Sequence, residues 1–143
     1  MIDLARRAAG PAERQAGFAA LRELQVPWVE RYLIREGRTV PVVRTRLSLR
    51  DRRGTLKVRW GFGRGTYRVL PGLYAAGEPG PDSPVFVSAN YKLSFDTLRS
   101  SLAGIDGWIL VLDTKGVNVW CAAGKGTFGT GELVSRIAKT KLA

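Results

Sequence analysis

Continuous apolar runs, separated by polar and glycine-rich stretches, dominate the second half of the chain. Gly107–Leu112 is wholly apolar and predicts a buried strand, and Val85–Val87 predicts a second one. A helix is expected between them over Thr97–Ala103, with Ser94 or Asp96 as its N-terminal cap. A strand, a helix and a strand in this order form a βαβ unit, so the two strands are expected to lie parallel in one sheet.

The first half of the chain has a weaker pattern. Val40–Leu49 and Leu56–Trp60 are expected to pair as an antiparallel hairpin around a turn at Arg50–Gly54, with arginine on the outer face. Met1–Gln25 is rich in alanine, leucine, arginine and glutamate and predicts a helix. Trp28–Glu36 is interpreted as a short helix or an irregular arm.

A last amphipathic run, Glu132–Leu142, predicts a helix that follows the glycine-rich loop after the second buried strand. The predicted fold class is therefore α/β, with a parallel sheet core and an N-terminal antiparallel hairpin. Residues 1–39 are interpreted as a helical or irregular extension and residues 40–143 as the α/β domain. Open α/β sheets place their ligands beyond the carboxyl ends of the strands, which here means the loop from Asp113 to Thr130.

This loop fits neither of the common phosphate-binding patterns. A P-loop needs Ser or Thr after the Gly-Lys pair, but Gly124-Lys125 is followed by glycine. The glycines Gly124, Gly126 and Gly129 match a dinucleotide fingerprint in spacing, yet they do not open directly from the strand. Upstream of them, the segment 117–123 is expected to form a short helix with Asn118 as its cap.

The chain's one cysteine, Cys121, lies on this short helix beside Trp120 and is followed by two small alanines. A thiol can ligate a soft metal, and small residues allow a large flat ligand to approach the backbone. A free cysteine is also often a small buried hydrophobe, so the residues alone leave both interpretations open.

The segment Asn118–Lys125 resembles the signature of the mercury-methylating corrinoid proteins (HgcA). The resemblance extends from about Val40 to the C-terminus and includes further segments, namely Tyr67–Tyr74, Tyr91–Phe95, Val111–Gly116 and Gly126–Thr130. The corrinoid iron–sulfur protein of acetyl-CoA synthesis is related to that family and shares its fold, but not the cysteine at this position.

The resemblance implies a Rossmann-like corrinoid-binding domain in which the short helix caps a cobalamin. It implies that Cys121 is the lower axial ligand of the cobalt, and hence both the metal-binding and the catalytic residue. Loops at the strand ends are expected to hydrogen-bond the corrin amides, although Asn90 and Thr114 suit turn or capping roles equally well. The expected cofactor-binding residues are Ser88, Ala89, Asn90, Thr114, Asn118, Val119, Trp120, Cys121, Ala122, Ala123, Gly124 and Lys125.

For activity, the resemblance implies a corrinoid-dependent methyltransferase that passes a methyl group to Hg(II) and gives methylmercury. It also implies a ferredoxin-like iron–sulfur partner, and a membrane domain that would place the protein at the cytoplasmic face of the inner membrane. No apolar run in this sequence has the length of a membrane-spanning helix, so an isolated soluble domain is expected.

Composition narrows the chemistry further. One cysteine among 143 residues permits no internal disulfide and no iron–sulfur cluster, and a free thiol suits the cytoplasm. The absence of histidine excludes histidine ligation of a corrinoid and histidine acid–base catalysis. The net charge of +11 is concentrated in residues 1–70, which hold 16 Lys/Arg against 6 Asp/Glu. Such a surface attracts anionic partners.

Two other functions stay open from the sequence. One is a methyl-carrying corrinoid protein of the acetyl-CoA pathway. The other is a basic module that binds a membrane surface or nucleic acid without a corrinoid. Nucleic acid is the less expected partner, because the aromatic residues are not interleaved with the arginines.

Overall fold

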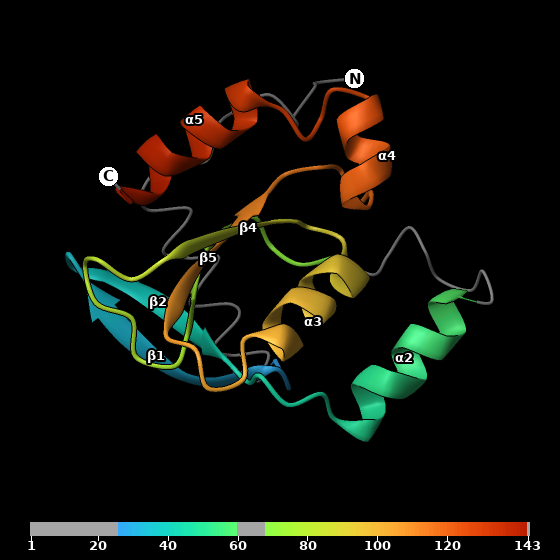
Figure 1. The fold of residues 1–143 in the computed structure, drawn as a ribbon, viewed down its shortest axis with the longest axis horizontal. Coiled ribbons are helices and arrows are strands. Elements are labelled where there is room, and N and C mark those ends of the chain that lie inside the picture. Colours follow the sequence, from blue (N-terminus) through green and yellow to red (C-terminus); the bar gives the residue numbers. More distant parts are fainter. Residues whose placement is uncertain (1–25, 60–67, 143) are drawn as a thin grey trace, which may run out of the picture.

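The structure, a computed structural model, describes residues 26–59 and 68–142. Its centre is a five-stranded sheet with the strand order β1-β2-β3-β5-β4 (Figure 1). The strands are β1 (Val29–Arg35), β2 (Arg38–Val43), β3 (Gly72–Ala76), β4 (Val85–Ala89) and β5 (Gly107–Leu112). The helices are α2 (Leu49–Arg59), α3 (Lys92–Ser101), α4 (Val119–Gly124) and α5 (Thr130–Thr140).

The sheet is mixed, which corrects the expectation of a parallel core. Strands β4 and β5 are parallel neighbours joined through α3, as the βαβ pattern predicts. Strand β3, however, lies beside β5 and runs antiparallel to it, while β2 is parallel to β3. The fold is therefore α/β in composition, and a Rossmann-like arrangement is not confirmed.

The N-terminal hairpin exists but was predicted in the wrong place. It is formed by β1 and β2, which pair antiparallel with Arg35 opposite Arg38. The two turn residues, Glu36 and Gly37, have φ of 50° and 72°, as a type I′ turn requires. The segment 28–36, interpreted as a helix or an arm, is thus largely strand.

Residues expected to form the turn and second strand of that hairpin belong instead to helix α2. Ser48 and Asp51 close its first turn reciprocally. The Ser48 N–H donates to Asp51 Oδ2 at 2.9 Å, and the Asp51 N–H donates to Ser48 Oγ at 3.1 Å. This Ser-x-x-Asp arrangement is a capping box, and it starts a helix where alternating residues had suggested a strand.

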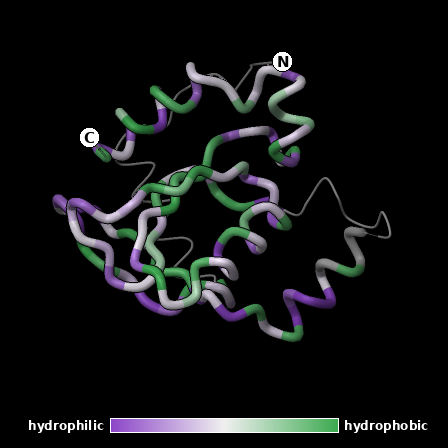
Figure 2. The backbone as a smooth tube through the Cα atoms, viewed as in Figure 1, coloured by the Kyte–Doolittle hydropathy of each residue, from purple (hydrophilic) through white to green (hydrophobic). Residues whose placement is uncertain are grey.

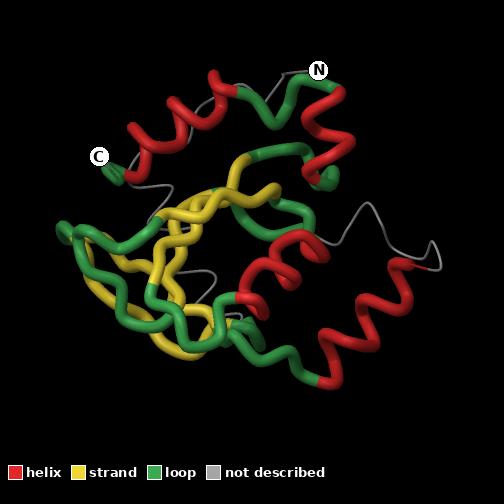
Figure 3. Tube along the Cα trace, in the orientation of Figure 1, coloured by secondary structure: helices red, strands yellow, loops and turns green. Residues whose placement is uncertain are grey.

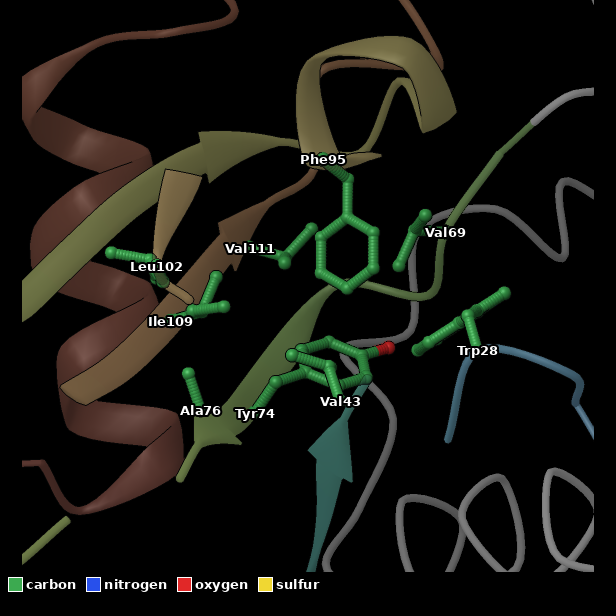
Figure 4. Packing of buried hydrophobic residues seen from close by; sticks show 9 residues of the cluster. All are labelled: Trp28, Val43, Val69, Tyr74, Ala76, Phe95, Leu102, Ile109 and Val111. Atoms are coloured by element: carbon green, nitrogen blue, oxygen red, sulfur yellow. The ribbon is translucent and has the colours of Figure 1, made fainter. Parts of the chain in front are cut away.

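Each face of the sheet has its own apolar core, and a helix covers each face (Figures 1 and 3). On the α3 face, Trp28, Tyr74 and Phe95 pack with ring centroids 5.0–5.6 Å apart, as Figure 4 shows. On the other face, Leu133 and Ile137 of α5 pack against residues such as Trp108 and Leu110. Because alternate residues of β5 enter opposite cores, the whole strand is buried.

Helix α3 begins at Lys92, five residues before the predicted start, and neither Ser94 nor Asp96 caps it. Asp96 is buried and binds two cations of its own helix, since Lys92 Nζ lies 2.6 Å from Asp96 Oδ2 and Arg99 Nε lies 2.7 Å from Asp96 Oδ1. Asp51 of α2 joins this cluster, with its Oδ2 3.0 Å from Arg99 Nη2. The ionic cluster thus connects α2 to α3.

Burial alone would raise the pKa of Asp51, but the hydrogen bonds from Ser48, the charge of Lys92 and a hydrogen bond from Arg99 lower it to about 2. Burial lowers the pKa of Lys92, although Asp96 and Asp51 partly oppose that effect. Asp51 therefore stays ionised in the folded protein at neutral pH.

The helix predicted over Met1–Gln25 lies outside the described residues, as does Trp60 at the end of the expected second strand. The division into residues 1–39 and 40–143 consequently stays a prediction, although β1 from the first part pairs into the sheet. Within residues 26–59 and 68–142, no helix combines the length and the apolar content that crossing a membrane requires.

Candidate functional site

The loop after β5 is fixed to the end of β4 by one buried side chain. Asn90 Oδ1 accepts hydrogen bonds from the Thr114 N–H at 3.0 Å, from the Thr114 hydroxyl at 2.9 Å and from the Gly116 N–H at 2.9 Å. The Asn90 N–H in turn donates to the carbonyl of Leu112 at 3.0 Å. The carboxyl ends of the two parallel strands are therefore held in one rigid unit.

A second set of contacts ties the loop to helix α5. The Asp113 N–H donates to Glu132 Oε1 at 3.0 Å, and the Asp113 carboxylate lies 3.0 Å from Lys115 Nζ. Burial would raise the pKa of Asp113, but the ammonium and backbone N–H of Lys115, with Arg136 further away, lower it below its usual range. Glu132 was not predicted to have this role; its spacing to Arg136 indicates only a helical ion pair.

Helix α4 follows this loop and is capped at both ends. Asn118 Oδ1 accepts the N–H of Cys121 at 2.8 Å, which confirms the predicted cap. At the other end the Thr127 N–H donates to the Ala122 carbonyl at 2.9 Å and the Gly126 N–H donates to the Ala123 carbonyl at 3.1 Å, which is a Schellman motif. Short helices are weak alone, so these caps fix the backbone around Cys121.

The exposure of α4 differs sharply from one side to the other. Ala122 is completely buried, whereas Cys121, Ala123 and Gly124 are exposed and 88% of the Trp120 surface is accessible. Lys125, at the C-terminal end, is exposed as well, and the first-turn residues Asn118 and Val119 are half-buried. The interpretation of Cys121 as a small buried hydrophobe is therefore wrong, because the thiol faces solvent.

The predicted strand-end residues are buried rather than open. Ser88, Ala89, Asn90 and Thr114 are each at most 4% exposed. The hydroxyl of Ser88 donates to the Ala89 carbonyl at 3.2 Å, and that of Thr114 lies 2.7 Å from the Val117 carbonyl oxygen as well as near Asn90. The turn-forming interpretation accounts for these contacts of Asn90 and Thr114, while their binding of a cofactor stays a prediction.

Among the described residues, no group of three or more histidine, cysteine, aspartate or glutamate side chains lies where it could hold a metal ion. The exposed thiol of Cys121 is a single soft donor.

Comparison with known proteins settles the family. A profile of the CO dehydrogenase/acetyl-CoA synthase delta subunit family matches residues 63–143, which is more than half of the chain and contains β3–β5 and α3–α5. The chain belongs to this family. The matched residues include the capped helix α4 and the Asn90–Thr114 contact, while α2 and the β1–β2 hairpin precede them.

Archaeal relatives agree with the family profile. The chain is 42% identical over 77 residues to the acetyl-CoA decarbonylase/synthase complex subunit gamma of Archaeoglobus fulgidus, which covers 52% of this chain and 16% of that protein. The subunit gamma of Methanopyrus kandleri is 42% identical over 71 residues, covering 48% of this chain and 15% of the relative. The chain thus matches about one sixth of the length of these relatives.

These findings correct the resemblance to the mercury-methylating proteins. Both the family profile and the relatives are those of the acetyl-CoA decarbonylase/synthase system. The identification as HgcA and the assignment to mercury methylation are therefore wrong. Three further expectations rested on that resemblance and lose their basis: Hg(II) as the substrate, a ferredoxin-like partner and a location at the inner membrane.

Proposed function

We propose that this chain provides a corrinoid-binding, methyl-carrying domain of the acetyl-CoA decarbonylase/synthase type, and that Cys121 is the axial ligand beneath the cobalt. The observation that carries the proposal is the exposed thiol on a helix capped at both ends, beyond the carboxyl ends of two parallel strands. Family membership supports the acetyl-CoA alternative among the functions left open by the sequence.

The residues present fit such a cofactor. Cys121 offers one soft donor, and Ala123 and Gly124 beside it are exposed and too small to keep a flat ring away from the helix backbone. The exposed indole of Trp120 adds apolar surface on the same helix. The hydrogen bond from the Cys121 N–H to Asn118 holds the backbone of the ligand residue in place.

The corrinoid would supply the methyl-transfer chemistry itself, while the chain supplies an axial ligand and a fixed site for it. A thiolate is the donor form of cysteine, and coordination to a metal favours loss of the thiol proton. The buried Asn90–Thr114 contact keeps the loop that leads into α4 from moving as the ligand binds. Protein subunits of an acetyl-CoA decarbonylase/synthase complex are the expected partners. Electrons would come from such a partner, because one cysteine cannot hold a cluster.

The test is a titration of the full chain with methylcobinamide, a corrinoid without a nucleotide base of its own, under anaerobic conditions. The visible spectrum should change to that of a thiolate-ligated species with one corrinoid per chain. Cys121→Ala should abolish the change and weaken binding about tenfold or more, since even losing a partner that only orients a metal ligand costs about 10–100-fold.

A moved thiol provides the matched control, because any exposed cysteine can react with a corrinoid. The double variant Cys121→Ala, Val134→Cys carries an exposed thiol on α5, where Val134 is 59% exposed. This variant should not reproduce the spectrum. If the moved thiol gives the same spectrum and affinity as Cys121, or if the wild-type chain leaves the spectrum unchanged, the proposal is wrong.

A further inference from the structure

Helix α2 presents two different faces, which follow from its sequence and the helical repeat. With 3.6 residues per turn, Leu56 lies about 20° from Leu49 around the helix axis, and Arg52 and Arg53 lie within about 60° of it. Asp51 lies about 160° away, on the opposite side. We call the side formed by Leu49, Arg52, Arg53 and Leu56 the outer face of α2.

The opposite side fixes how α2 is held. Asp51 is 8% exposed, and its carboxylate reaches Lys92 at 3.5 Å and Arg99 at 3.0 Å in the ionic cluster on α3. Figure 1 shows α2 beside α3 and away from the sheet. The only acidic residue of α2 is therefore directed into the protein, and its charge does not offset the arginines outside.

The outer face combines exposed leucine with exposed arginine. Leu49 is 74% and Leu56 is 54% exposed, and Arg52 and Arg53 are exposed beside them. Among the described residues, neither arginine has an acidic side chain within ion-pair distance. Exposed Arg44, Arg46 and Arg50 extend the positive charge along the same segment. Figure 2 shows that the first half of α2 is mainly hydrophilic.

We propose that the outer face of α2 binds the surface of an anionic phospholipid bilayer, with the leucines entering the interface and the arginines contacting the headgroup phosphates. Binding to such an interface grows with the apolar area that enters it and with the electrostatic attraction of basic side chains to anionic lipids. Charge complementarity requires an anionic partner. The two leucines favour lipid over nucleic acid, because phosphate contacts on a duplex leave exposed leucines without apolar surroundings. The proposal is independent of the corrinoid.

The test is sedimentation of the full chain with vesicles of phosphatidylcholine and phosphatidylglycerol in equal parts, compared with vesicles of phosphatidylcholine alone. The wild-type chain should bind the anionic vesicles and lose binding as salt is raised. Arg52→Gln with Arg53→Gln should weaken binding roughly 25-fold, at about fivefold for each arginine near the surface. Leu49→Ser with Leu56→Ser should weaken it about tenfold or more.

Helix α5 and its C-terminal cap residue, Lys141, supply matched controls. Lys139→Gln with Lys141→Gln removes the same charge elsewhere, and Val134→Ser removes an exposed apolar side chain. Both should keep most of the binding, and circular dichroism should show that every variant is folded. Equal losses in the α2 and α5 variants, equal binding to neutral vesicles, or no binding would each overturn the proposal. So would binding to a short DNA duplex at the same salt that is as tight as vesicle binding, with the leucine variant unaffected in both assays.

Discussion

Replacing Asn90 by alanine tests the contact that joins β4 to the loop before α4. The substitution removes the oxygen that accepts the Thr114 N–H at 3.0 Å and the Gly116 N–H at 2.9 Å. Thr114 is completely buried and Gly116 is partly buried, so both donors would lose their partner away from bulk water. The Thr114 hydroxyl contributes little to the loss, since it can donate to the Val117 carbonyl at 2.7 Å instead.

Each buried donor left without a partner costs about 1–3 kcal/mol. With one donor fully and one partly buried, Asn90→Ala should lower the free energy of unfolding by about 2–4 kcal/mol, a large part of the 5–15 kcal/mol typical of a domain. Urea denaturation measures the difference. Hydrogen exchange should also accelerate at the amides of Thr114 and Gly116.

The matched control is Thr97→Ala, which removes an exposed hydroxyl that donates to the Leu93 carbonyl of the same helix, α3. It should change the free energy of unfolding by about 0.5 kcal/mol or less. A loss below about 1 kcal/mol for Asn90→Ala, with unchanged exchange at the two amides, would refute the reasoning that this side chain fixes the loop.

Three further changes test other parts of the structure. Asn118→Ala removes the N-cap of α4 and should cost about 1 kcal/mol in urea denaturation; no loss would mean that the cap does not hold the helix. Asp51 has a folded pKa of about 2, below its usual 3.8, so the stability that it contributes is present above pH 3.8 and is lost as the pH falls toward 2. In urea midpoints measured across this range, Asp51→Asn should flatten the pH dependence, and an unchanged slope would contradict the ionic cluster. Gly116 has φ of +74° and an added Cβ would collide with the Arg68 side chain, so Gly116→Ala should cost about 1–2 kcal/mol. Adding Arg68→Ala to this variant should recover only the part of the lost stability that the collision causes. Full recovery would show that backbone strain is negligible.

The sequence best predicted those elements whose structure depends on residues close in the sequence. The apolar run of β5 could only be a strand buried on both faces, and the amphipathic pattern of α5 needs only one apolar surface to lie on. The cap of α4 was also predictable, because Asn118 acts on a backbone N–H three residues away. These features depend on local chemistry, and the structure has each of them.

Elements that depend on distant residues were predicted less well. The start of α3 was placed too late because Ser94 or Asp96 was expected to cap the helix. Asp96 instead lies inside the helix, where it is buried by pairing with Lys92 and Arg99. The strand alternation expected over 56–60 conflicted with the capping box of Ser48 and Asp51, which the sequence did contain. The position of β3 between β2 and β5 could not be derived from the order of elements.

The candidate site shows the same division. Its short helix, cap and cysteine were predicted, but the burial of Asn90 and Thr114 depends on how β4 and β5 meet. The Asn118–Lys125 segment, with further segments from about Val40 onward, suggested one family, whereas the profile match over residues 63–143 assigned another.

The central claim is that the Cys121 sulfur binds cobalt, and X-ray absorption at the cobalt edge tests it most directly. Methylcobinamide bound to the wild-type chain should show one sulfur atom among the ligands of cobalt, and this sulfur should be missing in Cys121→Ala. Cobalt surrounded only by carbon, nitrogen and oxygen in the wild-type complex would contradict the account.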